Sequence, residues 1–287
     1  MLNHERRARC DKGADVNTRR RLATAVAAVS VMAMLLVATG AGAPANASPV
    51  ALAAGPATGP ALSVPQAKLD ASISCRWVDA AHRHEPVLLV HGTIATAAEN
   101  WGWNYQRVLP TKGFDTCVVQ MPNRSLDDIQ ASSEYVVNAI RRVNQWSSRK
   151  VDVIGHSQGG LQPRWAIKYW PDVRQRVDDF VMLGAPNHGT YVANVLGLAG
   201  CTGACLQMKA GSRFLHALNA GDETPGSVSY TSIYTATDEL VQPSGFPSTT
   251  AALSGGRNVL VQSLCPGRIV GHLGLVDDGV VYDAVID

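Results

Sequence analysis

The sequence predicts an α/β fold, with a doubly wound, mostly parallel sheet and helices on both faces. Short continuous apolar runs, typical of strands buried on both faces, recur along the chain. Segments with helical apolar spacing alternate with these runs. A Gly-His-Ser-Gln-Gly turn at residues 155–159 directly follows one of the runs. In such folds the functional groups gather at the carboxyl ends of the strands.

Six apolar runs are expected to form the strands, and two of the intervening segments have a helical pattern. The clearer helix spans residues 132–146, where the apolar residues share one face. The second is expected over residues 161–170, with Pro163 kinking it or delaying its regular start. The strands are expected at residues 86–90, 115–120, 151–154, 180–183, 229–234 and 258–262.

Residues 1–47 have the plan of a secretory signal peptide. Three arginines at 19–21 precede an apolar stretch over 22–37, and small residues follow. Ala45-Asn46-Ala47 is the preferred cleavage site, and Ala41-Gly42-Ala43 is the second choice. The apolar stretch is short for a membrane span, although a retained anchor is an alternative. We predict an extracellular protein that is cleaved near Ala47, exported by the general or the twin-arginine route.

Residues 48–64 are rich in Ala, Gly and Pro and are expected to form a disordered leader. Residues 65–287 are then one catalytic domain, because no second linker divides them. The net charge is +2 and the basic residues are scattered, which argues against nucleic-acid binding. Motifs typical of metal sites are absent from the sequence, so no metal and no cofactor are expected. We also expect a monomer.

The Gly-His-Ser-Gln-Gly turn makes Ser157 the candidate nucleophile. This pattern puts a serine on a tight strand-to-helix turn with its hydroxyl exposed. Glycines flank the serine because a side chain there would collide with neighbouring elements. An oxyanion needs preorganised N–H donors. Gln158 offers one at the helix start, and Thr93, after the first long apolar run, offers the second.

A serine hydroxyl is a weak nucleophile, so it needs a neighbouring base and an acid that orients the base. His272 follows the last predicted strand, and the chain order serine, acid, histidine requires a late histidine. His188, after the fourth strand, is the alternative base. Asp238 follows the fifth strand and is the predicted acid. Glu239 is adjacent, but it should face the opposite way if the strand's alternation continues.

The cysteines fit an oxidising compartment. Removal of Cys10 with the signal peptide would leave an odd number, so one thiol should stay free. A bond between Cys75 and Cys117 would close a loop of about forty residues and stabilise the fold by about 4 kcal/mol. One pair and one free thiol are expected among the rest, and the spacing does not assign them. These are Cys201, Cys205 and Cys265.

From about Leu69 to His272 the chain resembles the secreted α/β-hydrolase lipases, in particular the lipase B family and related bacterial lipases. The resemblance is carried by residues 133–140, by the serine turn at 157–161 and by the acid loop at 236–243. The acid loop, Ala-Thr-Asp-Glu-Leu-Val-Gln-Pro, is a long match and is the segment most specific to this family. The resemblance implies an α/β-hydrolase fold, a Ser157-Asp238-His272 triad, an oxyanion hole at Thr93 and Gln158, and a disulfide between Cys75 and Cys117.

One departure concerns His156, which stands where those lipases have a bulky tryptophan that bounds the alcohol pocket. We therefore expect His156 to line the substrate pocket and the selectivity to differ. The apolar, glycine-rich segment 189–211 is expected to be either a lid or a buried helix and loop.

Taken together, the residues predict a secreted lipase or esterase that cleaves acylglycerols or similar lipid esters through an acyl-enzyme. A lipid–water interface is a candidate working surface. The alternatives are an acyltransferase or polyester hydrolase with the same triad, and a catalytically silent secreted binding protein.

Overall fold

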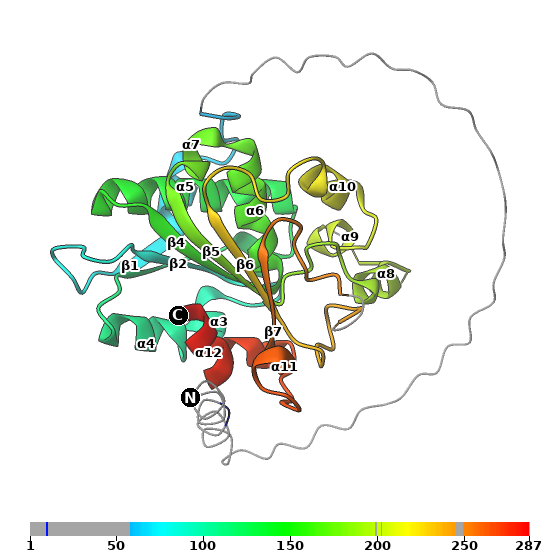
Figure 1. Cartoon of the computed structure of the whole chain (residues 1–287). Coiled ribbons are helices and arrows are strands. Elements are labelled where there is room, and N and C mark those ends of the chain that lie inside the picture. The colour runs from blue at the N-terminus through cyan, green and yellow to red at the C-terminus, as the bar shows by residue number, and fades with distance from the viewer. Residues whose placement is uncertain (1–9, 11–57, 199, 202, 245–248, 287) are drawn as a thin grey trace, which may run out of the picture.

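The computed structural model describes residue 10 and residues 58–286, apart from 199, 202 and 245–248. The described residues form a seven-stranded sheet in the order β1-β3-β2-β4-β5-β6-β7 (Figure 1). Every neighbouring pair is parallel except β1 with β3, which confirms the predicted mostly parallel sheet. The strands are β1 (Ile73–Arg76), β2 (Val87–Val90), β3 (Thr116–Val119), β4 (Val151–His156), β5 (Val177–Leu183), β6 (Ser229–Tyr234) and β7 (Arg257–Leu260).

Strand β1 is not among the predicted strands, and the last strand ends earlier than predicted. In β1 intermediate and exposed residues alternate, so this antiparallel edge strand has no apolar run to reveal it. Val261 and Gln262 were expected in a strand, but β7 ends at Leu260 and the short helix α11 (Val261–Leu264) follows directly. A short apolar run alone does not distinguish a strand from a buried helical turn.

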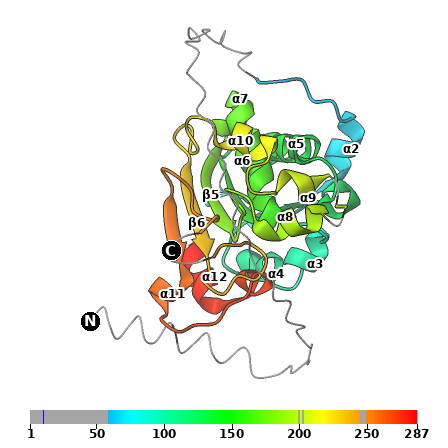
Figure 2. The same cartoon turned by 90° about the vertical axis from the view of Figure 1, so that its right-hand side faces the viewer.

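Helices cover both faces of the sheet (Figures 1 and 2). One face packs against α2 (Gln66–Ala71), α5 (Ile129–Ser147), α6 (Leu161–Tyr169) and α7 (Pro171–Arg174), and α8 (Tyr191–Leu198), α9 (Ala204–Gln207) and α10 (Arg213–Asn219) lie beside α6. The other face carries α3 (Ala97–Trp101), α4 (Tyr105–Thr111) and α12 (Gly279–Ile286). Three short 3₁₀ turns complete the described elements: η2 (Pro122–Ser125), η3 (Ser157–Gly160) and η4 (Leu273–Val276).

The central strands are buried on both faces, which explains their continuous apolar runs. In β2, Leu88 and Val90 belong to the core beneath α5 and α6. Val87 and Leu89 belong to the core beneath α3 and α4. Full burial of one such leucine contributes about 2 kcal/mol by area. The two cores support the sheet near the carboxyl ends of its strands, where the candidate site residues follow.

The two predicted helices are present, the first with an earlier start and the second with the predicted one. α5 begins at Ile129, because the carboxylate of Asp128 caps it by accepting hydrogen bonds from the N–H groups of Gln130 and Ala131 at 2.8 and 3.0 Å. α6 begins only at Leu161, after the 3₁₀ turn η3, in line with the expected delay. Pro163 lies in the first turn of α6, where a missing N–H breaks no helical hydrogen bond.

The predicted leader extends too far toward the domain. Residues 58–64 pack on it instead of lying free. Glu134 accepts hydrogen bonds from the backbone N–H groups of Ser63 and Val64 at 2.6 and 2.8 Å. The indole of Trp170 donates to the Pro60 carbonyl at 2.8 Å. Composition predicts disorder here, but these backbone groups find partners on α5 and α6.

The proposed signal peptide, apart from Cys10, lies outside the described residues, as does the leader before residue 58. No helix in the described part of the chain is both long enough and apolar enough to span a membrane.

Candidate active site

Ser157 is the first residue of η3 and directly follows β4 at a sharp turn. Its φ of +56° is in the left-handed region, which a non-glycine residue adopts at a cost of about 1–3 kcal/mol. The flanking glycines allow this turn to pack. A Cβ on Gly155 would lie 2.1 Å from the Gly159 carbonyl oxygen, and one on Gly159 would lie 2.2 Å from the Val90 oxygen. The backbone on both sides of Ser157 is therefore tightly packed.

The predicted base and acid contact each other directly. His272 Nδ1 lies 2.9 Å from Asp238 Oδ2, and both side chains are almost fully buried. The other Asp238 oxygen accepts hydrogen bonds from the N–H groups of Leu240 and Val241, at 2.9 and 2.7 Å. The carboxylate is thus fixed, and it favours the tautomer with the proton on Nδ1. This tautomer leaves Nε2 of His272 available as a base.

The Asp238–His272 pair lies over the end of β5. A Cβ on Gly184, which follows that strand with a φ of +58°, would lie 3.2 Å from His272 Nδ1 and 3.3 Å from Asp238 Oδ2. Among the described residues Ser157 forms no hydrogen bond with His272. Catalytic contacts of this kind are often long in the absence of substrate and shorten when it binds.

The two predicted oxyanion residues are in contact beside the serine turn. The Thr93 hydroxyl donates a hydrogen bond to Gln158 Oε1 at 2.5 Å. Gly92 is so close to the turn that a Cβ on it would lie 3.1 Å from the Ser157 Cβ. His91, directly after β2, is buried, and its Nδ1 lies 2.8 Å from the Gly92 carbonyl oxygen. Burial lowers the pKa of His91, so it stays neutral and holds this backbone without adding charge.

His156 is buried beneath His272. Its Nδ1 lies 3.1 Å from Asn100 Oδ1, and its Nε2 lies 3.2 Å from the His272 carbonyl oxygen. The two imidazole rings pack with centroids 4.9 Å apart. Burial, reinforced by the neighbouring His272, lowers the pKa of His156 to about 3. A neutral ring therefore supports the predicted base from below.

Two further residues near the site were not assigned a role from the sequence. Asn100, on α3, accepts a hydrogen bond from the Gly92 N–H at 3.0 Å, and no sequence pattern marks it. Glu239 Oε2 accepts a hydrogen bond from the His272 backbone N–H at 2.8 Å. Glu239 was expected to face away, but β6 ends at Tyr234, so strand alternation does not reach Glu239.

The structure also bears on the alternative base His188, on the segment 189–211 and on a possible metal site. His188 is not near the pair, because its Nε2 contacts Glu223 Oε1 at 3.1 Å. The segment 189–211 was expected to be a lid or a buried helix and loop, and it contains α8, whose only buried residue is Ala193. Among the described residues, no group of three or more His, Cys, Asp or Glu side chains could hold a metal ion.

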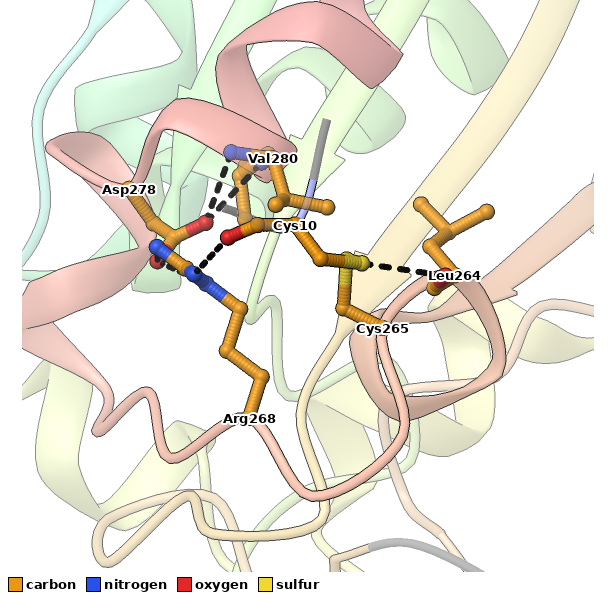
Figure 3. Close-up of a disulfide and its surroundings, with 7 residues drawn as sticks. Cys10, Leu264, Cys265, Arg268, Asp278 and Val280 are labelled. Atoms are coloured by element: carbon orange, nitrogen blue, oxygen red, sulfur yellow. Dashed lines mark hydrogen bonds and ion pairs between the residues drawn. A yellow bond between two sulfur atoms is a disulfide. The ribbon is translucent and has the colours of Figure 1, made fainter. Parts of the chain in front are cut away.

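The cysteines form three disulfides, Cys75–Cys117, Cys201–Cys205 and Cys10–Cys265. The first is the bond that the resemblance implies. The expected free thiol is absent from the described part of the full chain, because Cys265 is bonded to Cys10, which was assigned to the signal peptide (Figure 3). Arg268 lies beside this bond and pairs with Asp278. The prediction of one free thiol concerned the chain without Cys10, and in that chain Cys201 pairs with Cys205 and Cys265 is left over.

The fold and the arrangement of groups at the strand ends define this protein as an α/β-hydrolase. The Lipase (class 2) family matches residues 84–261. The chain is 34% identical to Lipase B of Pseudozyma antarctica over 229 residues, which is 78% of this chain and 67% of that protein. The chain therefore belongs to the class 2 lipases, hydrolases of the lipase and carboxylesterase type.

Other relatives agree with this assignment. Triacylglycerol lipase of Pseudomonas fragi is 26% identical over 51% of this chain and 52% of that protein. The structure of Aspergillus fumigatus lipase B superimposes with a TM-score of 0.74 at 30% identity, covering 84% of this chain and 62% of that one. Bacillus licheniformis lipase BlEst2 shares the fold, with a TM-score of 0.57 at 16% identity over 75% of this chain and 96% of that one. The chain thus spans about half to two thirds of the length of its lipase B and triacylglycerol lipase relatives.

Proposed function

We propose that this protein is a secreted serine hydrolase that cleaves carboxylic esters, with lipid esters as its substrates. The observation that carries the proposal is the buried Asp238–His272 pair, 2.9 Å between Oδ2 and Nδ1, over the same sheet end as the Ser157 turn. A serine, a base and an orienting acid at adjoining strand ends form the machinery of acyl transfer.

The reaction uses each of these groups in turn. The Ser157 hydroxyl oxygen attacks the ester carbonyl carbon while His272 Nε2 takes the hydroxyl proton. The tetrahedral oxyanion is held by the backbone N–H groups of Thr93 and Gln158. The Thr93 hydroxyl joins them when it turns away from Gln158 Oε1, its acceptor in this structure. Asp238 stabilises the imidazolium that forms on His272. The imidazolium then protonates the leaving alcohol, and an acyl-Ser157 ester remains.

Hydrolysis of the acyl-enzyme repeats the sequence with water. His272 Nε2 takes a proton from water, which attacks the acyl carbon, and the acid departs as Ser157 regains its proton. His156 replaces a bulky tryptophan beneath this centre, and we expect selectivity toward the alcohol part of the ester to differ from that of the lipase B family.

Exposed apolar side chains lie next to several site residues in the chain, and they support a lipid substrate. They flank the oxyanion residue Thr93, the acid and the base, and they continue along α8. Thr190 connects α8 to the acid loop, since its hydroxyl donates to the Leu240 carbonyl at 2.6 Å. A grouped apolar surface of this kind is typical of contact with another apolar phase. We call this group the apolar rim: Ile94, Val195, Leu198, Leu240, Ile269 and Leu273.

Export is supported by the disulfides, which form in oxidising compartments. The apolar segment that follows the three arginines at 19–21 has the plan of a signal peptide, which would direct export. The relative from Pseudomonas fragi, named a triacylglycerol lipase, supports acylglycerols as substrates.

The test is hydrolysis of p-nitrophenyl butyrate by the wild type and by Ser157→Ala. Removal of the nucleophile should lower kcat by about 10⁶-fold and leave the fold intact. Turnover that survives in the variant contradicts the proposal. Tributyrin emulsion, polyester film and an added alcohol acceptor then separate a lipase from the polyester hydrolase and the acyltransferase.

A further inference from the structure

Ile94, directly after the oxyanion residue Thr93, has an unusual backbone conformation. Its φ is +62°, in the left-handed region that β-branched residues rarely adopt. Its side chain is 66% exposed, so apolar packing does not hold it there. The conformation matters because it determines the direction of the peptide group on the carboxyl side of Thr93. Another interaction must therefore keep the chain in this shape.

Arg124 supplies that interaction through both its backbone and its side chain. The Arg124 carbonyl accepts a hydrogen bond from the Ile94 N–H at 2.8 Å. Its guanidinium donates to the Ile94 carbonyl from Nε at 3.0 Å and from Nη2 at 2.6 Å. One residue thus holds both polar groups of Ile94.

Glu99 fixes the guanidinium in turn. Its Oε2 lies 2.6 Å from Arg124 Nη2 and also accepts a hydrogen bond from the Thr96 N–H at 2.8 Å. Glu99 belongs to the capping box that starts α3, so the ion pair is anchored to a helix end. A planar guanidinium can reach the Ile94 carbonyl and this carboxylate at once, which a lysine ammonium on a single stem does less well.

Arg124 is itself presented by a strained turn. Asn123, Arg124 and Ser125 have φ values of +43°, +53° and +61°, three consecutive non-glycine residues in the left-handed region. Ser125 is buried and accepts a hydrogen bond from Gln162 Nε2 at 3.0 Å, which ties the turn to α6. Strain of this kind persists only where the surroundings enforce it, and it concentrates at functional sites.

We propose that Arg124, held by Glu99, is a positioning residue for the oxyanion hole. His91 contacts the carbonyl of the peptide group that precedes Thr93, and Arg124 holds the peptide group that follows it. Together they fix the direction of the Thr93 N–H toward the oxyanion. This inference rests on the proposed ester hydrolysis, and it adds a residue that touches neither the substrate nor the triad.

The test compares Arg124→Gln with the matched control Arg142→Gln. Arg142 on α5 also makes a partly exposed ion pair, with Asp70 and away from the site, and there both carboxylate oxygens accept hydrogen bonds. For p-nitrophenyl butyrate, Arg124→Gln should lower kcat about tenfold and leave KM within about twofold, because loss of a whole oxyanion donor costs about 10²–10³. The Ki of butylboronic acid, whose tetrahedral adduct occupies the oxyanion hole, should rise about tenfold in parallel.

Arg124→Lys and Glu99→Gln complete the series if Arg124→Gln folds poorly. A lysine keeps the positive charge but lacks the planar set of N–H donors of a guanidinium. The kcat of Arg124→Lys should therefore stay several-fold below that of the wild type. Glu99→Gln should give a smaller loss in the same direction. Unchanged kcat and Ki in Arg124→Gln, or equal losses in Arg142→Gln, overturn the inference. Loss of the proposed function itself would appear separately, as an inactive wild type or an active Ser157→Ala.

Discussion

At the scale of single residues, His272 is held at three of its groups. Asp238 contacts its Nδ1, Glu239 accepts a hydrogen bond from its backbone N–H, and His156 lies against its carbonyl oxygen. The late histidine and the acid before it follow from chain order, so both were predictable from the sequence. The supports from Glu239 and His156 depend on where β6 ends and on ring packing, which local patterns do not encode.

Asp238→Ala should cost activity but less than Ser157→Ala. The acid orients the base and does not bond to substrate, so we expect kcat to fall on the order of 10⁴-fold for Asp238→Ala against 10⁶-fold for Ser157→Ala. Initial rates on p-nitrophenyl butyrate check this order. A rate equal to the wild type in Asp238→Ala would remove Asp238 from the mechanism.

His156 should make the fold weaker in acid. Burial lowers its pKa to about 3 in the folded protein, whereas the unfolded chain has the ordinary value near 6.5. Below pH 6.5 the unfolded state therefore binds a proton that the folded state does not, so stability falls as the pH drops from 6.5 toward 3. The contribution of this one group is about 2 kcal/mol between pH 6.5 and pH 5.

Urea unfolding of His156→Asn at these two pH values measures the effect. The variant should lose about 2 kcal/mol less stability than the wild type over this interval. His216→Asn is the control, because His216 is exposed on α10. An equal acid loss in the wild type and His156→Asn would show that His156 does not titrate in this way.

At the scale of elements, the start of α8 is joined to the acid loop by three hydrogen bonds. The Thr190 hydroxyl donates to the Leu240 carbonyl and accepts from the Gln242 N–H at 3.0 Å, while the Tyr191 N–H donates to the Gln242 carbonyl at 3.0 Å. The apolar composition of α8 was evident from the sequence. Its exposure was not, because an apolar segment is equally typical of a buried helix and of a surface that meets lipid.

Charged substitutions on α8 should lower the hydrolysis rate on emulsified esters and leave the rate on dissolved esters unchanged. In Val195→Lys/Leu198→Lys, two side chains that are 66% and 90% exposed lose their affinity for an apolar phase. We expect the rate on tributyrin emulsion to fall about tenfold, since about 1–2 kcal/mol of apolar contact is lost. The rate on dissolved p-nitrophenyl butyrate should stay within about twofold.

Trp146→Lys provides the matched control for this experiment. Trp146 is also an exposed apolar residue, at 48%, but it lies near the end of α5 and outside the apolar rim. Its replacement should leave both rates unchanged. If emulsion and soluble rates fall equally in the α8 variant, α8 acts on the site itself and not on the interface.

At the scale of the whole molecule, the sheet was largely predictable and the ends of the chain were not. A strand buried on both faces can have an unmistakable apolar run, as in β2. The edge strand β1 has no such run, because it is half exposed. Residues 58–64 were expected to be disordered, since composition does not reveal that Glu134 binds their backbone.

The disulfides make a prediction about the processed protein. In the full chain Cys265 is bonded to Cys10, and residues 1–47 are the proposed signal peptide. A chain that begins at Ser48 should therefore have one free thiol, at Cys265, and should keep the other two bonds. Thiol titration with Ellman's reagent in denaturant, without reductant, should give one equivalent for this chain and none for the full chain. Equal counts in the two chains contradict the pairing.

The central claim is that Ser157 is an activated nucleophile, and covalent labelling tests it most directly. The folded protein is treated with a fluorophosphonate probe, digested and analysed by mass spectrometry. Our account predicts close to one probe per chain on the peptide that contains Ser157, and almost none in His272→Ala, because an unactivated serine hydroxyl reacts slowly. Labelling elsewhere, or no labelling of the wild type, would contradict the account and favour a catalytically silent binding protein.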